Sequence, residues 1–165
     1  MIEKVYCCRK TSDLPPEWGQ VIESPAGEAT FHTDILSYWD GIASLAVAGE
    51  TGIGWFELSS RPFTGGEVEC HRLTPEALLC FQGAAACFVG RPVDGETLGP
   101  EDAAAFYVEQ GKGFVFSPGT WHSLPFPITD RASFWVLFRK GTAQTDLEVL
   151  NLEQKRQWRF KLSMG

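Results

Sequence analysis

Long apolar runs, clusters of basic residues and paired cysteines are all missing from this 165-residue sequence. No apolar run approaches the ~20 residues that a membrane-spanning helix needs, so no membrane partner is expected. The net charge is −7 and no stretch is rich in Lys and Arg, which argues against nucleic acid as a partner. The first ten residues, MIEKVYCCRK, lack the apolar core of a signal peptide, and a cytoplasmic location is therefore expected.

The five cysteines follow no zinc-ribbon spacing, and their odd number does not suit a disulfide framework. Cys7 and Cys8 are adjacent, which fits neither a set of disulfides nor a tetrahedral zinc site. We therefore expect five reduced thiols, most of them buried as small apolar side chains.

Turn-forming residues are plentiful, because 17 glycines and 10 prolines punctuate the chain. Between the turns lie short runs rich in Phe, Trp, Val and Leu, such as GWFELSS, GFVFS and ASFWVLF. Many short strands between turns are typical of an all-β sandwich or barrel. No linker or repeat interrupts the sequence, so residues 1–165 are predicted to form one all-β domain.

Little helix is expected. The segment SDLPPEWGQ could hold one helical turn, and GPEDAAAFYV could begin as a helix before it returns to strand. The tail NLEQKRQWRFKL is predicted to be a short helix or an extension that packs against a neighbour. The six tryptophans are expected in the core or in subunit contacts, because aromatic side chains bury large areas.

Histidine is scarce, which makes the surroundings of each of the three easier to judge. Glu69 and His71 lie two residues apart, so on an extended strand both side chains point to one face and Cys70 points to the other. Glu76 follows beyond Pro75, and a turn is therefore expected between His71 and Glu76.

The second histidine of interest ends the run SPGTWH, in which a Pro-Gly turn precedes Trp121 and His122. His122 is expected at the start of a strand, whereas His32 is expected on a loop or at the surface. A lone histidine is more often structural than functional. Combined with Glu69 and Glu76 at their spacing, however, His71 and His122 point to a shared metal or acid/base site.

The spacing E-x-H-x4-E-x6-G, which ends at Gly83, resembles the first motif of the cupin superfamily, with Glu69 in place of its usual first histidine. SPGTWH resembles the turn of the second cupin motif. This resemblance implies a cupin double-stranded β-helix, a jelly-roll barrel that agrees with the all-β pattern. It also implies a divalent metal, Ni, Mn, Fe or Zn, and no organic cofactor, with the metal held by Glu69, His71, Glu76 and His122.

A longer series of segments resembles the ureidoglycolate lyase family, also named ureidoglycolate hydrolase. In chain order these segments are EWGQVIES, ILSYWDGIA, SSRPF, the E-x-H strand, AAFYVEQG, the W-H turn, FWVLFRKG and TDLEVLNL. Their shared order over residues 17–152 carries the resemblance.

The chain departs from the family pattern at residues that are presumed to line the pocket. The family tends to carry Gln at Glu76, an Asn-Tyr pair at 115–116 and the sequence W-H-H-P at the second turn. This chain has Val115-Phe116 and Ser123-Leu124 instead. These differences affect the expected substrate rather than the expected fold.

The family reaction splits ureidoglycolate into glyoxylate and urea in allantoin and purine breakdown, so the resemblance implies a carbon–nitrogen lyase of the amidine type. A base removes the hydroxyl proton, a carbonyl forms, and the C–N bond breaks as its nitrogen is protonated. The resemblance implies Glu69, His71 and His122 as catalytic groups. Arg61 and Arg139 are the candidates for holding the substrate carboxylate, because Arg offers a bidentate fork.

Charge also favours a metal. Two ionised glutamates and an anionic substrate would place three negative charges in one small cavity, and such charges raise carboxylate pKa values or repel the ligand. A divalent ion would cancel both glutamates. Without a metal, one glutamate could instead be protonated and act as the acid.

Two other functions stay open on sequence grounds. One is a different metal-dependent cupin enzyme, such as a dioxygenase, isomerase or epimerase that acts on a small organic acid. The other is a non-catalytic cupin that binds a small molecule. Cupins commonly pair through edge strands, so a homodimer is expected by analogy of fold.

Overall fold

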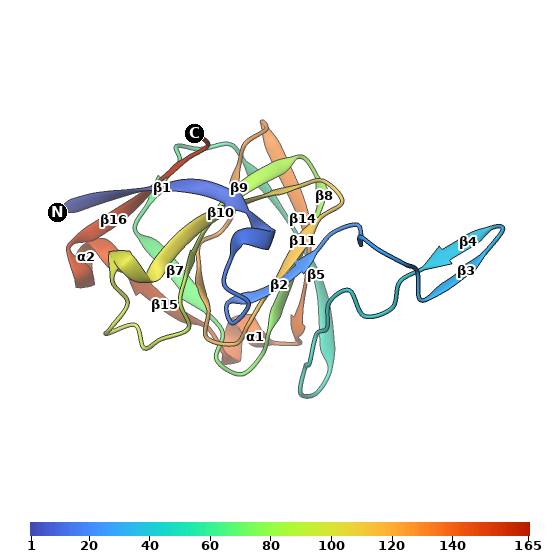
Figure 1. The fold of residues 1–165 in the computed structure, drawn as a ribbon. Coiled ribbons are helices and arrows are strands. Elements are labelled where there is room, and N and C mark those ends of the chain that lie inside the picture. The colour runs from blue at the N-terminus through green and yellow to red at the C-terminus, as the bar shows by residue number, and fades with distance from the viewer.

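The computed structural model describes all 165 residues, and strands dominate it (Figure 1). The all-β prediction is therefore confirmed. The strands are β1 (Ile2–Lys10), β2 (Gly19–Ile22), β3 (Phe31–Thr33), β4 (Leu36–Tyr38), β5 (Thr51–Ser59), β6 (Thr64–Gly65), β7 (Glu67–Cys70), β8 (Glu76–Gln82), β9 (Ala84–Gly90), β10 (Ala103–Glu109), β11 (Gly113–Phe116), β12 (Trp121–His122), β13 (Phe126–Pro127), β14 (Arg131–Arg139), β15 (Glu148–Asn151) and β16 (Trp158–Ser163).

The helices are short and few, as expected. Two are 3-10 turns and two are α-helices of a single turn or little more, and none is long or apolar enough to cross a membrane. The second 3-10 turn leads directly into β10, as the sequence predicts. The α-helix at 142–145 has no counterpart among the predicted elements. The bounds are η1 (Thr11–Asp13), η2 (Pro100–Asp102), α1 (Thr142–Thr145) and α2 (Leu152–Arg156).

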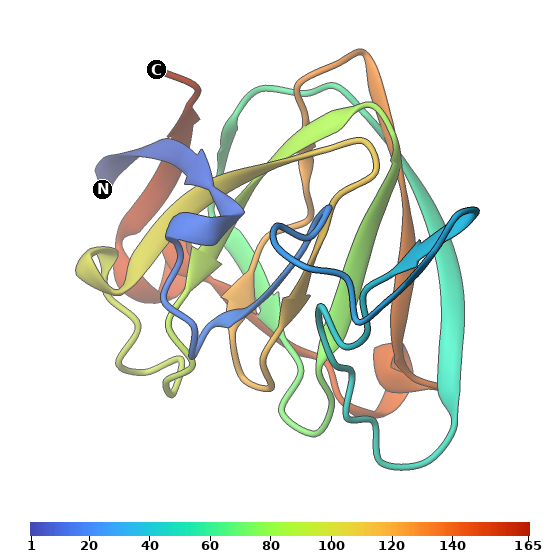
Figure 2. The ribbon, with the colours of Figure 1, turned by 45° about the vertical axis from the view of Figure 1, so that its right-hand side comes forward.

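Two large sheets enclose the inner core. One runs in the order β15-β7-β12-β9-β10-β1-β16-β6, with β13 paired to β9, and the other runs β2-β11-β8-β14-β5. Aromatic side chains fill the space between them, among them Phe106, Phe114, Phe116 and Phe134. Figure 2 shows the strands of both sheets curling around this space.

A second apolar cluster covers the outer face of the larger sheet. Strand β9 serves both clusters, because Cys87 and Val89 face the inner core while Ala86 and Phe88 face the outer cluster. This two-sided burial explains why its sequence, AAACFVG, is a continuous apolar run rather than an alternating one. The tail forms the short helix α2, as predicted, and then β16, which runs parallel to β1 within the same chain.

A hairpin of β3 and β4 projects from the body as an arm, which is clear in Figure 1. Its two strands pair with each other and with no other strand. His32 lies on this arm, exposed to solvent, and its Nδ1 lies 2.8 Å from Oγ of Ser37. The expectation of a surface histidine is confirmed.

Gly83 forms the turn between β8 and β9 and offers a test of the packing. Its φ is +80°, and a Cβ there would collide with the backbone carbonyl oxygen of Arg131 and with Oγ1 of Thr129. Gly111 has nearly the same φ, +81°, but nothing lies within 4 Å of the corresponding position. An alanine at either position would therefore be strained by the left-handed backbone conformation, and at Gly83 its Cβ would also collide with neighbouring atoms.

We expect Gly111→Ala to lower the free energy of unfolding by about 1–2 kcal/mol. We expect Gly83→Ala to lower it by at least about 1 kcal/mol more, because the β14 backbone must move to make room. Urea unfolding of both variants measures the difference. Equal losses would show that the turn yields without disturbing β14.

Candidate metal and acid/base site

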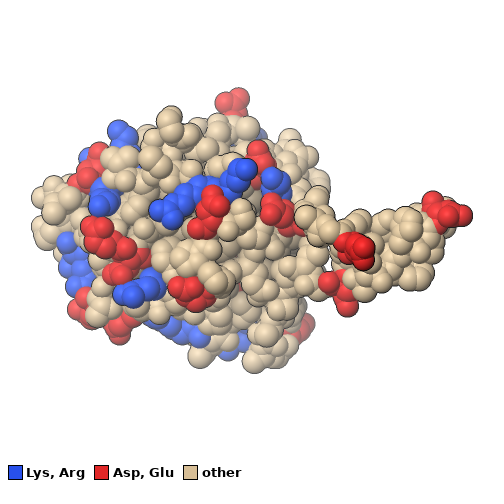
Figure 3. Space-filling model, in the orientation of Figure 1, with Lys and Arg blue, Asp and Glu red and all other residues tan.

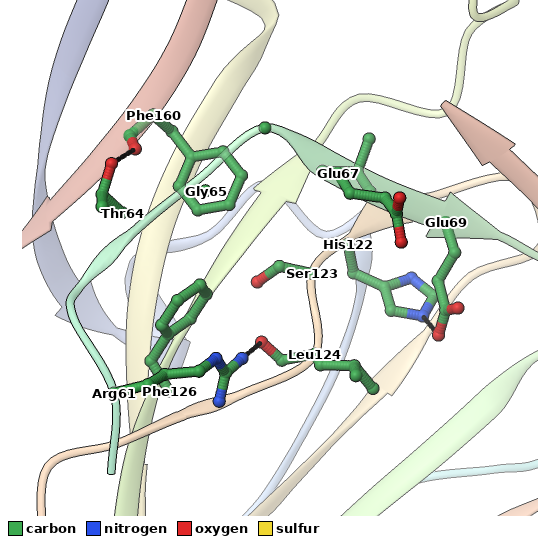
Figure 4. Close-up of a pocket in the computed structure, with 12 residues that line it drawn as sticks. Arg61, Thr64, Gly65, Glu67, Glu69, His122, Ser123, Leu124, Phe126 and Phe160 are labelled. Carbon is green, nitrogen blue, oxygen red and sulfur yellow. Dashed lines mark hydrogen bonds and ion pairs between the residues drawn. The ribbon is translucent and has the colours of Figure 1, made fainter. Parts of the chain in front are cut away.

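The site begins where β7 and β12 pair. Glu69 on β7 lies directly opposite His122 on β12, so one register position brings together residues 53 apart in the sequence. His122 Nε2 is 3.7 Å from Glu69 Oε1, as the close-up in Figure 4 shows. His122 is buried, whereas Glu69 remains partly exposed.

His71 and Glu76 complete the cluster from the turn that joins β7 to β8. His71 follows the last residue of β7, and Glu76 is the first residue of β8. Oε2 of Glu76 lies 2.7 Å from Nε2 of His71 and 3.5 Å from Nε2 of His122. The turn expected between His71 and Glu76 is therefore what brings the two side chains face to face.

Backbone carbonyls hold both imidazole rings from behind. Nδ1 of His71 lies 2.7 Å from the carbonyl oxygen of Asp146, and Nδ1 of His122 lies 3.0 Å from that of Thr120. A carbonyl oxygen can only accept, so each Nδ1 must donate its proton to the bond. In the neutral rings the free lone pair is therefore on Nε2, which faces the centre of the cluster.

Three buried atoms at that centre lack a hydrogen-bond partner: Nε2 of His71, Nε2 of His122 and Oε2 of Glu76. Nε2 of His71 lies 2.7 Å from Oε2 of Glu76, but in the neutral ring Nε2 carries no proton, so only a second proton on the imidazole or a bound cation would join the two atoms. Buried polar atoms are rarely left without a partner. A cation bound among them would satisfy all three.

The donor set fits a divalent transition metal. Ligand atoms of Glu69, His71 and His122 all lie within 4.8 Å of one another. Imidazole nitrogen combined with carboxylate oxygen suits Zn, Fe, Ni or Mn. The carbonyl bonds behind the rings are the kind of outer support that metal-binding histidines ordinarily have.

Opposite charges hold the metal-free cluster together. Burial alone raises the pKa of Glu76, but the two imidazoles outweigh burial and lower the pKa to about 2. Burial lowers the pKa values of His71 and His122, whereas Glu76 and Glu69 raise them, and the net direction for both is upward. Glu76 therefore stays ionised, which argues against Glu76 as the protonated acid.

Two cavities meet at Glu69 and His122. The inner one, about 180 Å³, has mostly apolar walls and contains the whole cluster, with Phe56, Leu78, Val136 and Phe138 among its lining residues. The outer one, about 250 Å³, is the pocket drawn in Figure 4. Ser123 and Leu124 line both cavities. A small molecule in either cavity would thus contact Glu69 and His122.

A family model described as ureidoglycolate lyase matches residues 18–159. The chain belongs to the ureidoglycolate lyase family. The match covers most of the chain and all four residues of the cluster, so the family resemblance seen in the sequence is confirmed. No curated protein sequence matches the chain.

Solved structures add the fold. A dTDP sugar isomerase from Desulfovibrio desulfuricans G20 superposes with a TM-score of 0.51 at 14% identity, over 79% of this chain and 82% of that one. A sugar 3,4-ketoisomerase from Thermoanaerobacterium thermosaccharolyticum gives 0.45 at 16% identity, over 59% of this chain, which spans only 64% of the ketoisomerase. The predicted cupin jelly-roll fold is confirmed for this member of the ureidoglycolate lyase family.

The two arginines singled out by the sequence lie in different surroundings. Arg61 lines the outer cavity, donates to the carbonyl oxygens of Pro125 and Leu124 at 2.8 and 3.1 Å, and lies 3.9 Å from the centre of the Phe126 ring. Arg139 donates to Oγ1 of Thr145 and lines neither cavity. Of the two arginines, only Arg61 therefore lines a cavity that Glu69 and His122 also line.

Not every presumed pocket residue lies in a cavity wall. Val115 and Phe116 line neither cavity, because β11 is buried behind the site, and this corrects the sequence interpretation. The Phe116 ring instead stacks on His122, with ring centres 4.3 Å apart and planes 12° apart. Cys70 faces the outer cluster, as expected, and none of the five cysteines forms a disulfide.

No sequence pattern singled out Asp146 as part of the site. Its backbone carbonyl orients His71, while its buried carboxylate accepts hydrogen bonds from the backbone N–H groups of Arg72 and Leu73 at 2.9 and 2.8 Å. Asp146 thus fixes both the ring and the chain that carries it. A contact through a backbone carbonyl can be made by any residue type, so only the folded structure shows which residue makes it.

We expect the protein to bind about one divalent ion per chain, because the cluster offers a single set of converging ligands. His122→Ala should abolish this binding, whereas His32→Ala, which removes an exposed histidine on the arm, should leave it unchanged. Metal content after dialysis, measured by mass spectrometry, tests both, and circular dichroism checks the folding of each variant. Equal metal content in the two variants would contradict the assignment.

Asp146→Ala should weaken metal binding by about 10–100-fold although it removes no ligand, because the 71–73 backbone loses two anchors. Asp146→Asn retains one acceptor and should fall between Asp146→Ala and the wild type. Glu148→Gln, which alters a partly exposed neighbour paired with Arg72, is the control. Calorimetric titration with the metal gives the affinities, and unchanged affinity in Asp146→Ala would refute the positioning role.

Proposed function

We propose that this protein is a lyase that splits ureidoglycolate into glyoxylate and urea. The observation that carries the proposal is the set of unsatisfied buried atoms on His71, His122 and Glu76, beside Glu69, in a chain of the ureidoglycolate lyase family. Such a centre suits the one demand of the reaction, which is to move a proton from a hydroxyl oxygen to a departing nitrogen. The carbon–nitrogen bond then breaks without any oxidation or reduction.

We assign the metal-holding role to Glu69, His71, Glu76 and His122. A divalent ion bound there would balance the two glutamate charges and lower the pKa of a coordinated hydroxyl. The apolar walls of the inner cavity would strengthen every charge interaction by excluding water. The walls of the inner cavity carry no Lys or Arg. Besides a bound metal, only protonated imidazoles could therefore balance the two glutamate charges there.

Proton transfer falls to Glu69 in this proposal. Glu69 lines both cavities and is partly exposed, so its carboxylate is the one of the two that substrate and water can reach. Glu76 is buried with a low pKa and serves as a fixed negative charge that keeps the imidazoles in place. A general base and a general acid each contribute about 10²–10⁴-fold to such reactions.

Arg61 is proposed to hold the substrate carboxylate. It has no carboxylate partner within ion-pair distance, and its two carbonyl contacts and the Phe126 ring fix the guanidinium in the wall of the cavity that Glu69 and His122 also line. A held but unpaired cation is a suitable site for an anion. Substrate would then bridge the two cavities, with its carboxylate toward Arg61 and its hydroxyl toward the cluster.

The proposed reaction is tested by glyoxylate release from ureidoglycolate, corrected for spontaneous decay. Parallel samples contain added Ni or Mn, or EDTA. We expect release that depends on the metal and that is lost in His122→Ala. Release that EDTA leaves unchanged would keep the reaction but make the four residues acid/base groups alone. No release with any metal would refute the function.

A pair of variants tests which of the two arginines holds the substrate carboxylate. Arg61→Ala should raise KM for ureidoglycolate by about 10-fold or more, because a charge-assisted bond to the substrate is lost. Arg139→Ala, outside both cavities, should change KM by less than about 2-fold, as surface changes usually do. Steady-state kinetics at saturating metal measures both, and the reverse order would assign the carboxylate to Arg139.

A further inference from the structure

The arm formed by β3 and β4, here defined as residues 27–42, lacks the support that a hairpin needs. Its strands have three residues each and pair only with one another. At its base, the indole of Trp39 donates to the carbonyl oxygen of Gly27, and the N–H of Asp40 donates to Oγ1 of Thr30. An isolated two-stranded hairpin is at best marginally stable in water, so the arm needs a surface to lie on.

The arm also presents apolar side chains to solvent. Ile35 at its tip is 97% exposed, and four further large apolar or aromatic side chains are about half exposed. A soluble monomer rarely leaves so many large apolar groups together on so small an element. The exposed set is Phe31, Ile35, Leu36, Tyr38 and Ile42.

A second exposed apolar surface lies on the outer side of the smaller sheet. Trp55 of β5, Phe81 of β8 and Trp135 of β14 form an aromatic triad with ring centres 4.7 to 6.4 Å apart, and each is exposed. Ile53, two residues before Trp55, extends it and is 70% exposed. We call these four residues the aromatic face. It lies against β5, which is the edge strand of the smaller sheet.

We propose that the arm of one copy of this protein docks on the aromatic face of a second copy. Both surfaces are unpartnered in one chain, and the arm extends away from its own body in Figure 1. A two-fold axis lets each copy supply the arm that the other needs, so one contact made twice covers both surfaces. Aromatic residues are also the side chains most enriched at such anchoring contacts.

Charge supports this pairing. Between Lys10 and Arg61 the sequence contains no Lys or Arg, and the arm carries Glu28, Asp34 and Asp40. Figure 3 accordingly shows acidic but no basic side chains on the projecting arm. Arg131, exposed at the start of β14, has no carboxylate within ion-pair distance. It lines a small pocket together with Glu57, whose carboxylate accepts a hydrogen bond from the Trp55 indole. Arg131 is therefore the cation available to the carboxylates of the arm, and Glu57 is the charge that they must avoid.

Sedimentation of the full chain tests the proposal at micromolar concentrations. We expect wild type to sediment as two copies of the 18.3 kDa chain. Ile35→Asp on the arm and Phe81→Asp on the aromatic face should each raise the dimer Kd by about 30-fold or more, because each places a charge at an apolar anchor. Ile2→Asp, at a 65% exposed site on β1, should leave the dimer unchanged.

Mixing the two disrupted variants separates arm docking from other pairings. The intact arm of Phe81→Asp can dock on the intact face of Ile35→Asp, so the mixture should form a heterodimer although each variant alone is a monomer. A pairing of face with face would give no such rescue, because the Phe81→Asp face would still be disrupted.

Three results would overturn the proposal. They are a wild-type protein that sediments as a single chain, an Ile35→Asp variant that remains a full dimer, and a mixture without heterodimer. Circular dichroism and thermal melting of the variants show that loss of the dimer is not loss of the fold. Since Ile35 is almost fully exposed in the single chain, its substitution should not disturb folding.

Discussion

The site depends on two hydrogen bonds, each from the Nδ1 of a buried imidazole to a backbone carbonyl. These bonds turn His71 and His122 so that both Nε2 atoms face the same carboxylate oxygen of Glu76. Without them the rings could rotate, and a buried ionised glutamate would lose the partners that hold its pKa near 2. The same geometry that stabilises Glu76 leaves atoms without hydrogen bonds at the centre, and this is what makes the cluster a candidate metal site.

The sheets explain why such an arrangement stays rigid. Strand β9 is buried on both faces, and β12 lies between it and β7, so His122 sits on backbone that solvent does not reach. The ring of Phe116 stacks on His122 and fills the space behind it, so the imidazole cannot move away from the centre of the cluster. Departures from the family pattern at Val115 and Phe116 therefore change the support of the site, whereas those at Ser123 and Leu124 change its walls.

The arm lacks this support. Residues of the inner core are held by neighbours on every side, but the arm has one neighbour along its length, its own second strand. The proposed docking would give the arm and the aromatic face the apolar cover that the single chain lacks. It would also place the acidic arm of one copy against the surface of the other.

The sequence by itself determined the strand-rich fold, the turn at Gly83, and the four residues Glu69, His71, Glu76 and His122, because alternation, turn residues and motif spacing are local properties. Only the tertiary structure decided that Asp146 and Thr120 orient the two rings and that Arg61 rather than Arg139 lines a cavity. Every residue has a backbone carbonyl, so the sequence does not show which carbonyl accepts a hydrogen bond from a histidine ring. Two arginines in similar segments are likewise indistinguishable by sequence alone. Which of them reaches the site is set by contacts between strands that lie far apart along the chain.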